Sequence, residues 1–111
     1  MNIGIDIEEV KRFEKYVNNK KYLKRVFVKE EILYSLTKEN SAQYLAARFA
    51  AKEAVWKALN IRNKNFSITD ISIKNTKKGK PQVYIKNKKC KRIDVSMSHT
   101  KKYVTAVAII F

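Results

Sequence analysis

The chain has 111 residues, of which 45% are hydrophobic and 11% aromatic, so it is expected to form one folded domain over residues 1–111 rather than a disordered basic tail. A formal net charge of +15 predicts an anionic partner, which could be nucleic acid, a phosphorylated cofactor or an acidic protein. No apolar run reaches the roughly 20 residues of a membrane span, and the first residues lack signal-peptide features. The lone cysteine fits a reducing compartment. We therefore expect a cytoplasmic protein without a membrane partner.

The first predicted element is a short strand near the N-terminus. Isoleucine alternates there with glycine or an acid, which is the period-two pattern of a half-buried strand. We therefore expect the isoleucines to face the core and the acids to project from the opposite face. The residues of this pattern are Ile3, Ile5 and Ile7 on one face and Gly4, Asp6 and Glu8 on the other.

Helices are predicted next. Apolar residues at helical spacing indicate a helix from Val10 to about Tyr16 and helical structure over Tyr22–Leu36, with a break near Val28–Lys29. Asn40 and Ser41 are suitable cap residues for a long alanine-rich helix over Ala42–Leu59. We expect two to three helices in this half of the chain.

The second half changes to period two. Alternation over Phe66–Ile73 loses phase at Thr69–Asp70, which predicts a bulge or two short strands, and Lys77–Pro81 is a turn signal. The last segment is apolar on both faces, so we expect it to be a central strand that forms a hairpin with the strand before it. The fold class is α+β: an N-terminal strand, helices, then an antiparallel β-meander in a single domain. The later strands are Val83–Ile85, Val95–Ser98 and Tyr103–Phe111.

The long helix carries an unusual carboxylate. On a helical wheel Leu45, Phe49 and Trp56 share one stripe, and Glu53 lies inside it with Lys57 at its edge. A carboxylate on a packing face needs a compensating cation or hydrogen bonds, so Glu53 is a candidate metal ligand or proton-transfer group. The alternative is a surface Glu53–Lys57 pair contributing about 0.2–0.5 kcal/mol.

Two further sets of residues could take part in chemistry. Asp6 and Glu8 leave the same face of a strand and could offer oxygens to one hard cation such as Mg²⁺, with Glu53 as a third carboxylate. The alternative is an edge strand with one wet face. His99, the only histidine, lies at an expected strand end, where side chains reach ligands, although a turn residue is the simpler interpretation.

Basic residues form two candidate partner surfaces. The segment Lys74–Arg92 holds nine lysines and arginines and no acid, which is either a solvated face or a nucleic-acid-binding patch. A non-enzymatic nucleic-acid-binding domain is therefore the alternative function, although the chain has no RNA-recognition signature. In the first helix Phe13 could be an apolar anchor between Arg12 and Lys15, which makes that helix the better partner surface.

Three segments together resemble one enzyme family. Gly4–Phe13, Arg48–Leu59 and Ser96–Thr100 occur in the order and spacing of the holo-acyl-carrier-protein synthases, the small branch of the 4′-phosphopantetheinyl transferases. The resemblance runs nearly end to end. It implies a Mg²⁺-dependent cytoplasmic transferase of fatty acid biosynthesis that moves the phosphopantetheine arm of coenzyme A onto a serine of an apo acyl carrier protein. Adenosine 3′,5′-bisphosphate is released, and a homotrimer with active sites between subunits is expected.

The resemblance also implies roles for single residues. Asp6 and Glu53 match the metal ligands, and Glu8 resembles an additional ligand of the larger branch of the superfamily. Lys57 is expected near the diphosphate as a catalytic residue, and the base that takes the serine proton is either Glu53 or a metal-bound hydroxide. One departure is Asn60, which stands where the family usually has glycine. The positions that match coenzyme A contacts are Arg48, Lys57, Lys80, Pro81 and His99, and those of the carrier-protein surface are Arg12, Phe13 and Lys15.

Overall fold

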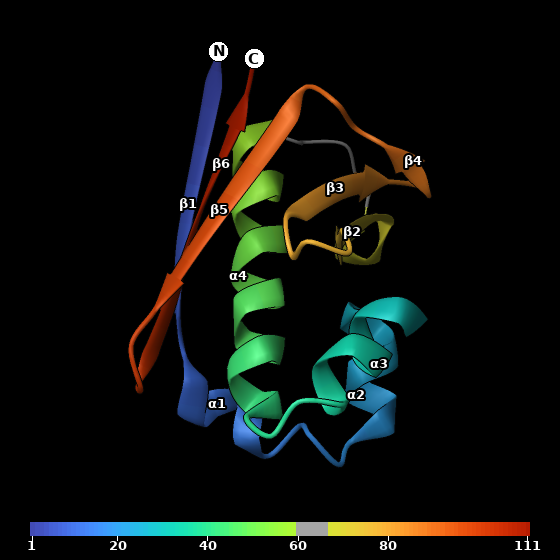
Figure 1. Cartoon of the computed structure of the whole chain (residues 1–111), viewed down its shortest axis with the longest axis vertical. Helices are drawn as coiled ribbons and strands as arrows, with labels where there is room; N and C mark the ends of the chain where they lie inside the picture. Colours follow the sequence, from blue (N-terminus) through green and yellow to red (C-terminus); the bar gives the residue numbers. More distant parts are fainter. Residues whose placement is uncertain (60–66) are drawn as a thin grey trace.

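One long helix organises the fold. The structure is a computed structural model that describes residues 1–59 and 67–111, so the expectations for Asn60 and Phe66 lie outside the described residues. Helix α4 (Ser41–Leu59) lies against a three-stranded antiparallel sheet on one side, and a smaller sheet and the helices α2 (Lys20–Val26) and α3 (Lys29–Leu36) lie on its other side (Figure 1). None of the described helices is both long enough and apolar enough to cross a membrane.

The larger sheet joins the two ends of the chain. Its strands are β1 (Asn2–Glu9), β5 (Ile93–His99) and β6 (Tyr103–Ile110), in the order β1-β6-β5. The last segment is therefore a central strand in a hairpin with β5, as predicted. Strand β6 pairs with β1 along its whole length, from Asn2 opposite Ile110 to Glu9 opposite Tyr103.

The smaller sheet contains the meander. Strands β2 (Ile71–Asn75), β3 (Pro81–Ile85) and β4 (Lys88–Lys89) pair in sequence order. The loss of phase at Thr69–Asp70 corresponds to a short 3₁₀ helix, η1 (Ile68–Asp70), rather than to a bulge or a second strand. The expected single meander is thus divided between two sheets, because β5 does not continue the smaller sheet and pairs with β6 instead.

The described residues contain four α-helices, more than the two to three expected. They are α1 (Val10–Glu14), α2 (Lys20–Val26), α3 (Lys29–Leu36) and α4. The predicted break near Val28–Lys29 is confirmed and divides the second helical segment into α2 and α3. The N–H of Val28 donates to Glu31 Oε1 at 3.0 Å, which satisfies a backbone donor at the start of α3.

Strand β1 faces α4 with the side opposite to the one predicted. The three isoleucines are exposed, Ile5 at 63%, whereas Gly4 is buried and Asp6 and Glu8 are partly buried. The reason is the close approach of the helix: a Cβ on Gly4 would lie 1.9 Å from the carbonyl oxygen of Ala54. Small side chains along α4 allow this contact, and it turns both acids of β1 toward the helix.

A buried ion pair connects the long helix to α3 and to the smaller sheet. Lys52 Nζ lies 2.8 Å from Glu31 Oε1, and both side chains are fully buried. Glu31 Oε2 also accepts the N–H of Ile73 at 2.9 Å, so one carboxylate joins α3, β2 and α4. Burial lowers the pKa of Lys52, and the carboxylate of Glu31 acts in the opposite direction. Neither residue stood out in the sequence as part of the core.

Replacing Lys52 by methionine is expected to lower the free energy of unfolding by about 3–5 kcal/mol, because Glu31 would keep a buried charge without its cation. Lys57→Met makes the same chemical change on the same helix, where the Lys57 side chain is 53% exposed, and is expected to cost about 1 kcal/mol or less. Denaturant unfolding of both variants measures the difference. Equal losses of unfolding free energy in the two variants would show that the buried ion pair does not stabilise the fold more than the exposed one.

Candidate active site

Asp6 and Lys57 meet where β1 lies against α4. Lys57 Nζ is 3.3 Å from Asp6 Oδ1 and donates a hydrogen bond of 3.0 Å to the carbonyl oxygen of Ile5. From the neighbouring strand β6, the Thr105 hydroxyl donates to the carbonyl oxygen of Asp6 at 3.0 Å. These bonds fix the backbone of β1 at the aspartate. The ion pair of Lys57 is therefore with Asp6, and not the Glu53–Lys57 helix pair considered as an alternative from the sequence.

Two more carboxylates lie close to Asp6. Burial raises the pKa of Glu8 to about 7, with a hydrogen bond to Asp6 and its negative charge acting in the same direction and Arg12 opposing them. Burial likewise raises the pKa of Glu53, again with a contribution from Asp6, while Lys57 and Arg12 act in the opposite direction. The structure thus brings together the three acids that the sequence singled out from β1 and α4.

The acids fit a divalent cation. Asp6 Oδ2 is buried and has no hydrogen-bond partner among the described residues. A bound cation stabilises neighbouring carboxylates whose repulsion is not fully compensated. Among residues 1–59 and 67–111, no three His, Cys, Asp or Glu side chains are arranged to hold a metal by themselves. A cation bound between Asp6 and Glu53 would complete its shell with substrate phosphates and water, as Mg²⁺ commonly does.

Arg12 holds the third acid. Arg12 Nη1 lies 2.7 Å from Glu8 Oε1, and its guanidinium lies over the rings of Phe13 and Phe49 at 5.3 and 5.2 Å. Glu8 is therefore paired with a cation of the chain, and its role as a third metal ligand stays a prediction.

The elevated pKa of Glu8 predicts a pH-dependent stability. The folded protein binds this proton more tightly than the unfolded chain, so its contribution is full below about pH 4.5 and is lost as the pH rises to about 7. Relative to Glu8→Gln, the wild type is expected to lose stability across this interval. Unfolding midpoints of the two proteins, measured between about pH 5 and pH 8, test this. Parallel curves would contradict it.

The surface of α1 differs from the sequence expectation at one residue. Phe13 is fully buried in the core, where its ring contacts Phe49, so it is not an exposed apolar anchor. Its position inside the helical stripe with Val10 and Val17 already favoured burial. The partly exposed aromatic residues next to this helix are Tyr16 and Tyr22, which stack with ring centroids 3.5 Å apart, and Lys15 lies over the Tyr16 ring at 5.2 Å.

Arg48 belongs to a different part of the structure. It is almost completely buried, lies over the Tyr34 ring at 4.2 Å and donates a hydrogen bond to Asn75, while its Nε has no partner in the part of the chain that the structure describes. Burial lowers its pKa, and neighbouring Tyr34 and Glu31 oppose this shift. With Tyr34 and Asn75, Arg48 borders a cavity of about 140 Å³. No sequence pattern indicated that Asn75 or Tyr34 would lie at this cavity.

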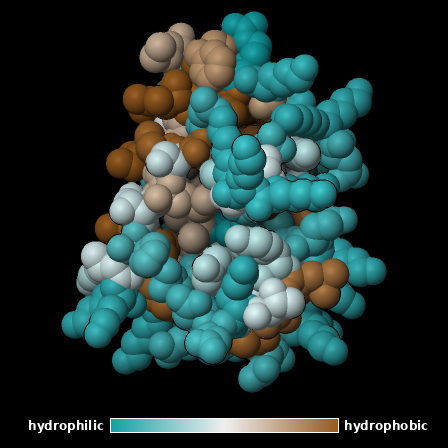
Figure 2. Space-filling view, viewed as in Figure 1, coloured by the Kyte–Doolittle hydropathy of each residue, from teal (hydrophilic) through white to brown (hydrophobic). Residues whose placement is uncertain are grey.

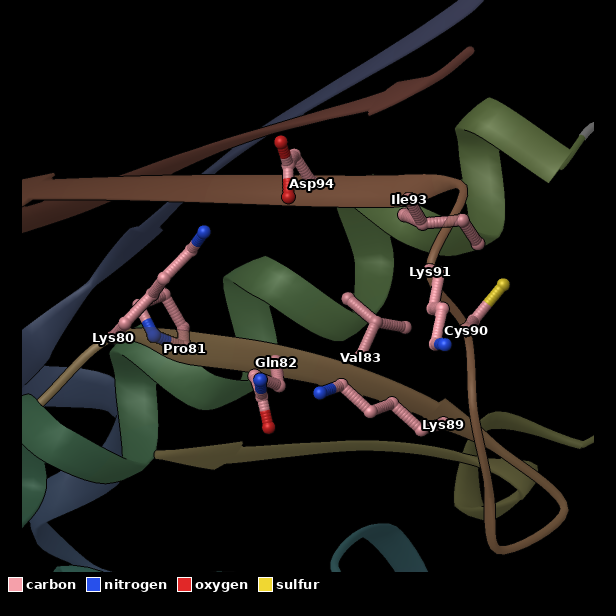
Figure 3. A pocket seen from close by; sticks show the side chains of 9 residues that line it. All are labelled: Lys80, Pro81, Gln82, Val83, Lys89, Cys90, Lys91, Ile93 and Asp94. Atoms are coloured by element: carbon pink, nitrogen blue, oxygen red, sulfur yellow. The ribbon is translucent and has the colours of Figure 1, made fainter. Parts of the chain in front are cut away.

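The turn at Lys80–Pro81 borders another pocket. This pocket of about 170 Å³ opens between β3 and β5, and Figure 3 shows Lys80 at one end and Cys90 and Lys91 at the other. His99 is exposed at the end of β5, opposite Val104 of β6. None of the acids near Asp6 lines this pocket or the cavity at Arg48. The predicted coenzyme A contacts are therefore distributed over several parts of one chain.

A family model covers nearly the whole chain. Residues 2–108 match the 4′-phosphopantetheinyl transferase superfamily. A holo-[acyl-carrier-protein] synthase from Treponema denticola is 42% identical over an alignment 119 positions long, which covers 99% of this chain and 97% of that protein. A protein of the same description from a Geobacillus species is 43% identical over 99% of this chain and 95% of its own.

Solved structures agree with these sequence relatives. The chain superposes on a Bacillus anthracis holo-(acyl-carrier-protein) synthase in complex with coenzyme A (3′,5′-ADP) with a TM-score of 0.82 and 31% identity, covering 98% of this chain and 94% of the other. A Helicobacter pylori holo-[acyl-carrier-protein] synthase in complex with coenzyme A gives a TM-score of 0.80 at 30% identity, with 98% and 99% covered.

Proposed function

The chain belongs to the 4′-phosphopantetheinyl transferase superfamily as an enzyme of the holo-[acyl-carrier-protein] synthase type, and from this we propose its reaction, metal and site residues. It transfers the phosphopantetheine arm of coenzyme A to a serine of an apo acyl carrier protein and releases adenosine 3′,5′-bisphosphate. The reaction requires Mg²⁺ and serves fatty acid biosynthesis in the cytoplasm. The observation that carries the proposal is the convergence of Asp6, Glu53 and Lys57 where β1 crosses α4.

Asp6 and Glu53 are proposed to hold the cation. The unpartnered Asp6 Oδ2 and the repulsion between the two carboxylates support this assignment. A Mg²⁺ ion bound there would neutralise charge on the diphosphate of coenzyme A while the bond to the departing nucleotide breaks.

Lys57 is proposed to act on the departing phosphate. Its Nζ is partly exposed and held beside Asp6 by the Ile5 carbonyl oxygen, so the ammonium is positioned before the substrate arrives. Glu53 is the chain's own candidate to take the serine proton, since it is the carboxylate of α4 that lies near both Asp6 and Lys57.

The remaining coenzyme A contacts are proposed to come from a neighbouring subunit. Arg48, Lys80, Pro81 and His99 border other cavities or surfaces than the acids do, and a trimer with sites between subunits would bring the two groups together. The outer face of the larger sheet supports such an assembly, because Ile3, Ile5 and Ile7 of β1 are exposed in a single chain. Figure 2 shows apolar side chains gathered at the upper left, where this sheet lies.

Replacing Ile5 by glutamate is expected to convert the trimer to a monomer, because the charge would be buried between subunits. Leu33→Glu is the matched control, since Leu33 is similarly exposed at 56% but lies on α3 outside the sheet. Sedimentation velocity measures both. A wild-type monomer, or a trimer that tolerates Ile5→Glu, would contradict the proposed interface.

The carrier protein is proposed to dock on the α1 surface through Arg12 and Lys15, beside the Tyr16–Tyr22 stack. The net charge of +15 would attract an acidic partner, and association is therefore expected to weaken with salt. Phe13 would support this surface from beneath, because it is buried.

Mass spectrometry of an apo carrier protein tests the whole proposal. After incubation with this protein, coenzyme A and Mg²⁺, the carrier protein is expected to gain one phosphopantetheine group on a serine. Chelation of the metal is expected to prevent the gain, and re-addition of Mg²⁺ to restore it. No mass gain with an apo carrier protein that a related synthase modifies, or a full gain in chelator, would overturn the corresponding part of the proposal.

A further inference from the structure

A second exposed apolar surface lies between α2 and α3. Most exposed large apolar side chains of the described residues belong to β1, β6 or the chain ends beside them, and the exceptions are Leu33 and Leu36 on α3, at 56% and 39% exposure. Figure 2 shows this smaller apolar patch at the lower right, where α2 and α3 lie in Figure 1. It is therefore separate from the sheet face that we assign to subunit contacts.

The patch lines a groove of about 700 Å³ with an apolar floor and a basic rim. Its floor includes the buried Leu23 and Phe27, and no carboxylate of residues 1–59 or 67–111 lines it. A groove of this size is within the range of specific binding sites. The other lining residues are Ile32, Leu33 and Leu36 among the apolar ones and Lys20, Lys24 and Lys29 among the basic ones.

The chemistry of the groove restricts its occupant. A second copy of the chain would bring a net charge of +15 against a basic rim, so self-association there is unfavourable. Nucleic acid would pair with the lysines but would leave the leucines of α3 without a partner. A concave apolar floor bordered by cations on α2 and α3 matches an amphipathic helix with an apolar stripe and flanking acids.

We propose that the α2–α3 groove binds an acidic amphipathic helix of a partner protein. Apolar side chains at helical spacing would fill the floor over Phe27 and Leu33, and carboxylates would pair with Lys20 and Lys24. The groove shares no lining residue with the α1 surface proposed for the carrier protein. The enzyme thus has a second docking surface, which does not depend on coenzyme A or on a metal.

A synthetic helix provides the probe. A fluorescein-labelled peptide of about 18 residues, or five helical turns, carries leucines spaced three and four apart and glutamates elsewhere. A scrambled peptide has the same composition. Fluorescence anisotropy of the full chain without coenzyme A or Mg²⁺ gives the affinity, so failure here leaves the transferase proposal untouched.

The test variant is Lys24→Glu combined with Leu33→Asp, and both positions are exposed, so the fold is expected to persist in circular dichroism. We expect this variant to bind the helical peptide at least about tenfold more weakly than the wild type, or about 1.4 kcal/mol. The matched control Lys88→Glu changes an exposed lysine on β4 and is expected to alter binding by no more than about twofold.

Four results would overturn the proposal. Equal binding of the scrambled peptide, or an equal loss in Lys88→Glu, would show diffuse attraction by the basic surface. Unchanged binding in the double variant would place the helix elsewhere. Binding of wild type, but not of the double variant, to phosphatidylserine-containing vesicles, with no peptide binding, would make the groove a membrane contact instead.

Discussion

Replacing Asp6 by asparagine is expected to lower the rate of phosphopantetheine transfer by about a thousandfold, which corresponds to about 4 kcal/mol of transition-state stabilisation. The amide keeps the shape of the side chain but removes the charge that would bind the cation. Lys57 would also lose the ion pair that holds its Nζ 3.3 Å from Asp6 Oδ1. Glu53→Gln is expected to have an effect of the same order, because the second carboxylate belongs to the same site.

The Asp6→Asn result separates chemistry from folding. The charge of Asp6 contributes to the raised pKa of Glu8 and of Glu53, so its removal relieves repulsion between carboxylates and the variant is expected to unfold at an equal or higher denaturant concentration. Glu39→Gln removes an exposed acid between α3 and α4 and is the control for net charge. Single-turnover rates of phosphopantetheine transfer are measured for the wild type, Asp6→Asn and Glu39→Gln. Activity of Asp6→Asn close to that of Glu39→Gln would rule out Asp6 as a metal ligand.

Replacing Gly4 by alanine is expected to lower the free energy of unfolding by more than about 3 kcal/mol, and larger side chains are expected to prevent folding. The new Cβ would lie 1.9 Å from the carbonyl oxygen of Ala54 and 2.7 Å from the amide nitrogen of Ala58. Both are backbone atoms of α4, so no side chain can move aside. Strand β1 would have to shift from the helix, and with it Asp6 from Lys57.

Gly79→Ala is the matched control for Gly4→Ala. Gly79 has a φ of +89° and no atom within 4 Å of an added Cβ, so the cost is conformational and about 1–2 kcal/mol. Guanidinium unfolding of the two variants gives the comparison. A smaller loss for Gly4→Ala than for Gly79→Ala would show that the helix and strand can separate without penalty.

The local patterns of the sequence predicted the elements of the fold well. The alternation of β1, the two-sided apolar run of β6 and the alanine-rich helix α4 all correspond to elements of the structure. These signals are periodic and extend over many residues, so they are robust. The pairing of β1 with β6 was not predictable in the same way, because strand partners far apart in sequence leave no local signal.

The sequence assigned the wrong face of β1 to the core. Isoleucine is the usual core residue, so Ile5 was expected inside, yet its side chain is exposed in the single chain. The informative residue was Gly4, whose missing Cβ lets Ala54 approach. Close packing between glycine and alanine depends on two distant segments, and hydrophobic periodicity does not detect it.

The candidate site was partly predictable. Glu53 and Lys57 were identified from their places on the helical wheel, and the structure brings both near Asp6. The role of Glu31 was not visible, because a glutamate in a charged helix normally lies in water. Its burial follows from the position of Lys52 on the side of α4 that faces α3. That position is a property of the assembled fold.

We propose that one divalent ion binds between Asp6 and Glu53. Anomalous diffraction from crystals grown with Mn²⁺ and coenzyme A tests it directly, since Mn²⁺ accepts the same oxygen ligands as Mg²⁺ and is visible by its anomalous signal. We predict one peak at about 2.1 Å, or slightly more, from carboxylate oxygens of both residues. A bound coenzyme A diphosphate with its metal ligated by neither residue would contradict the claim.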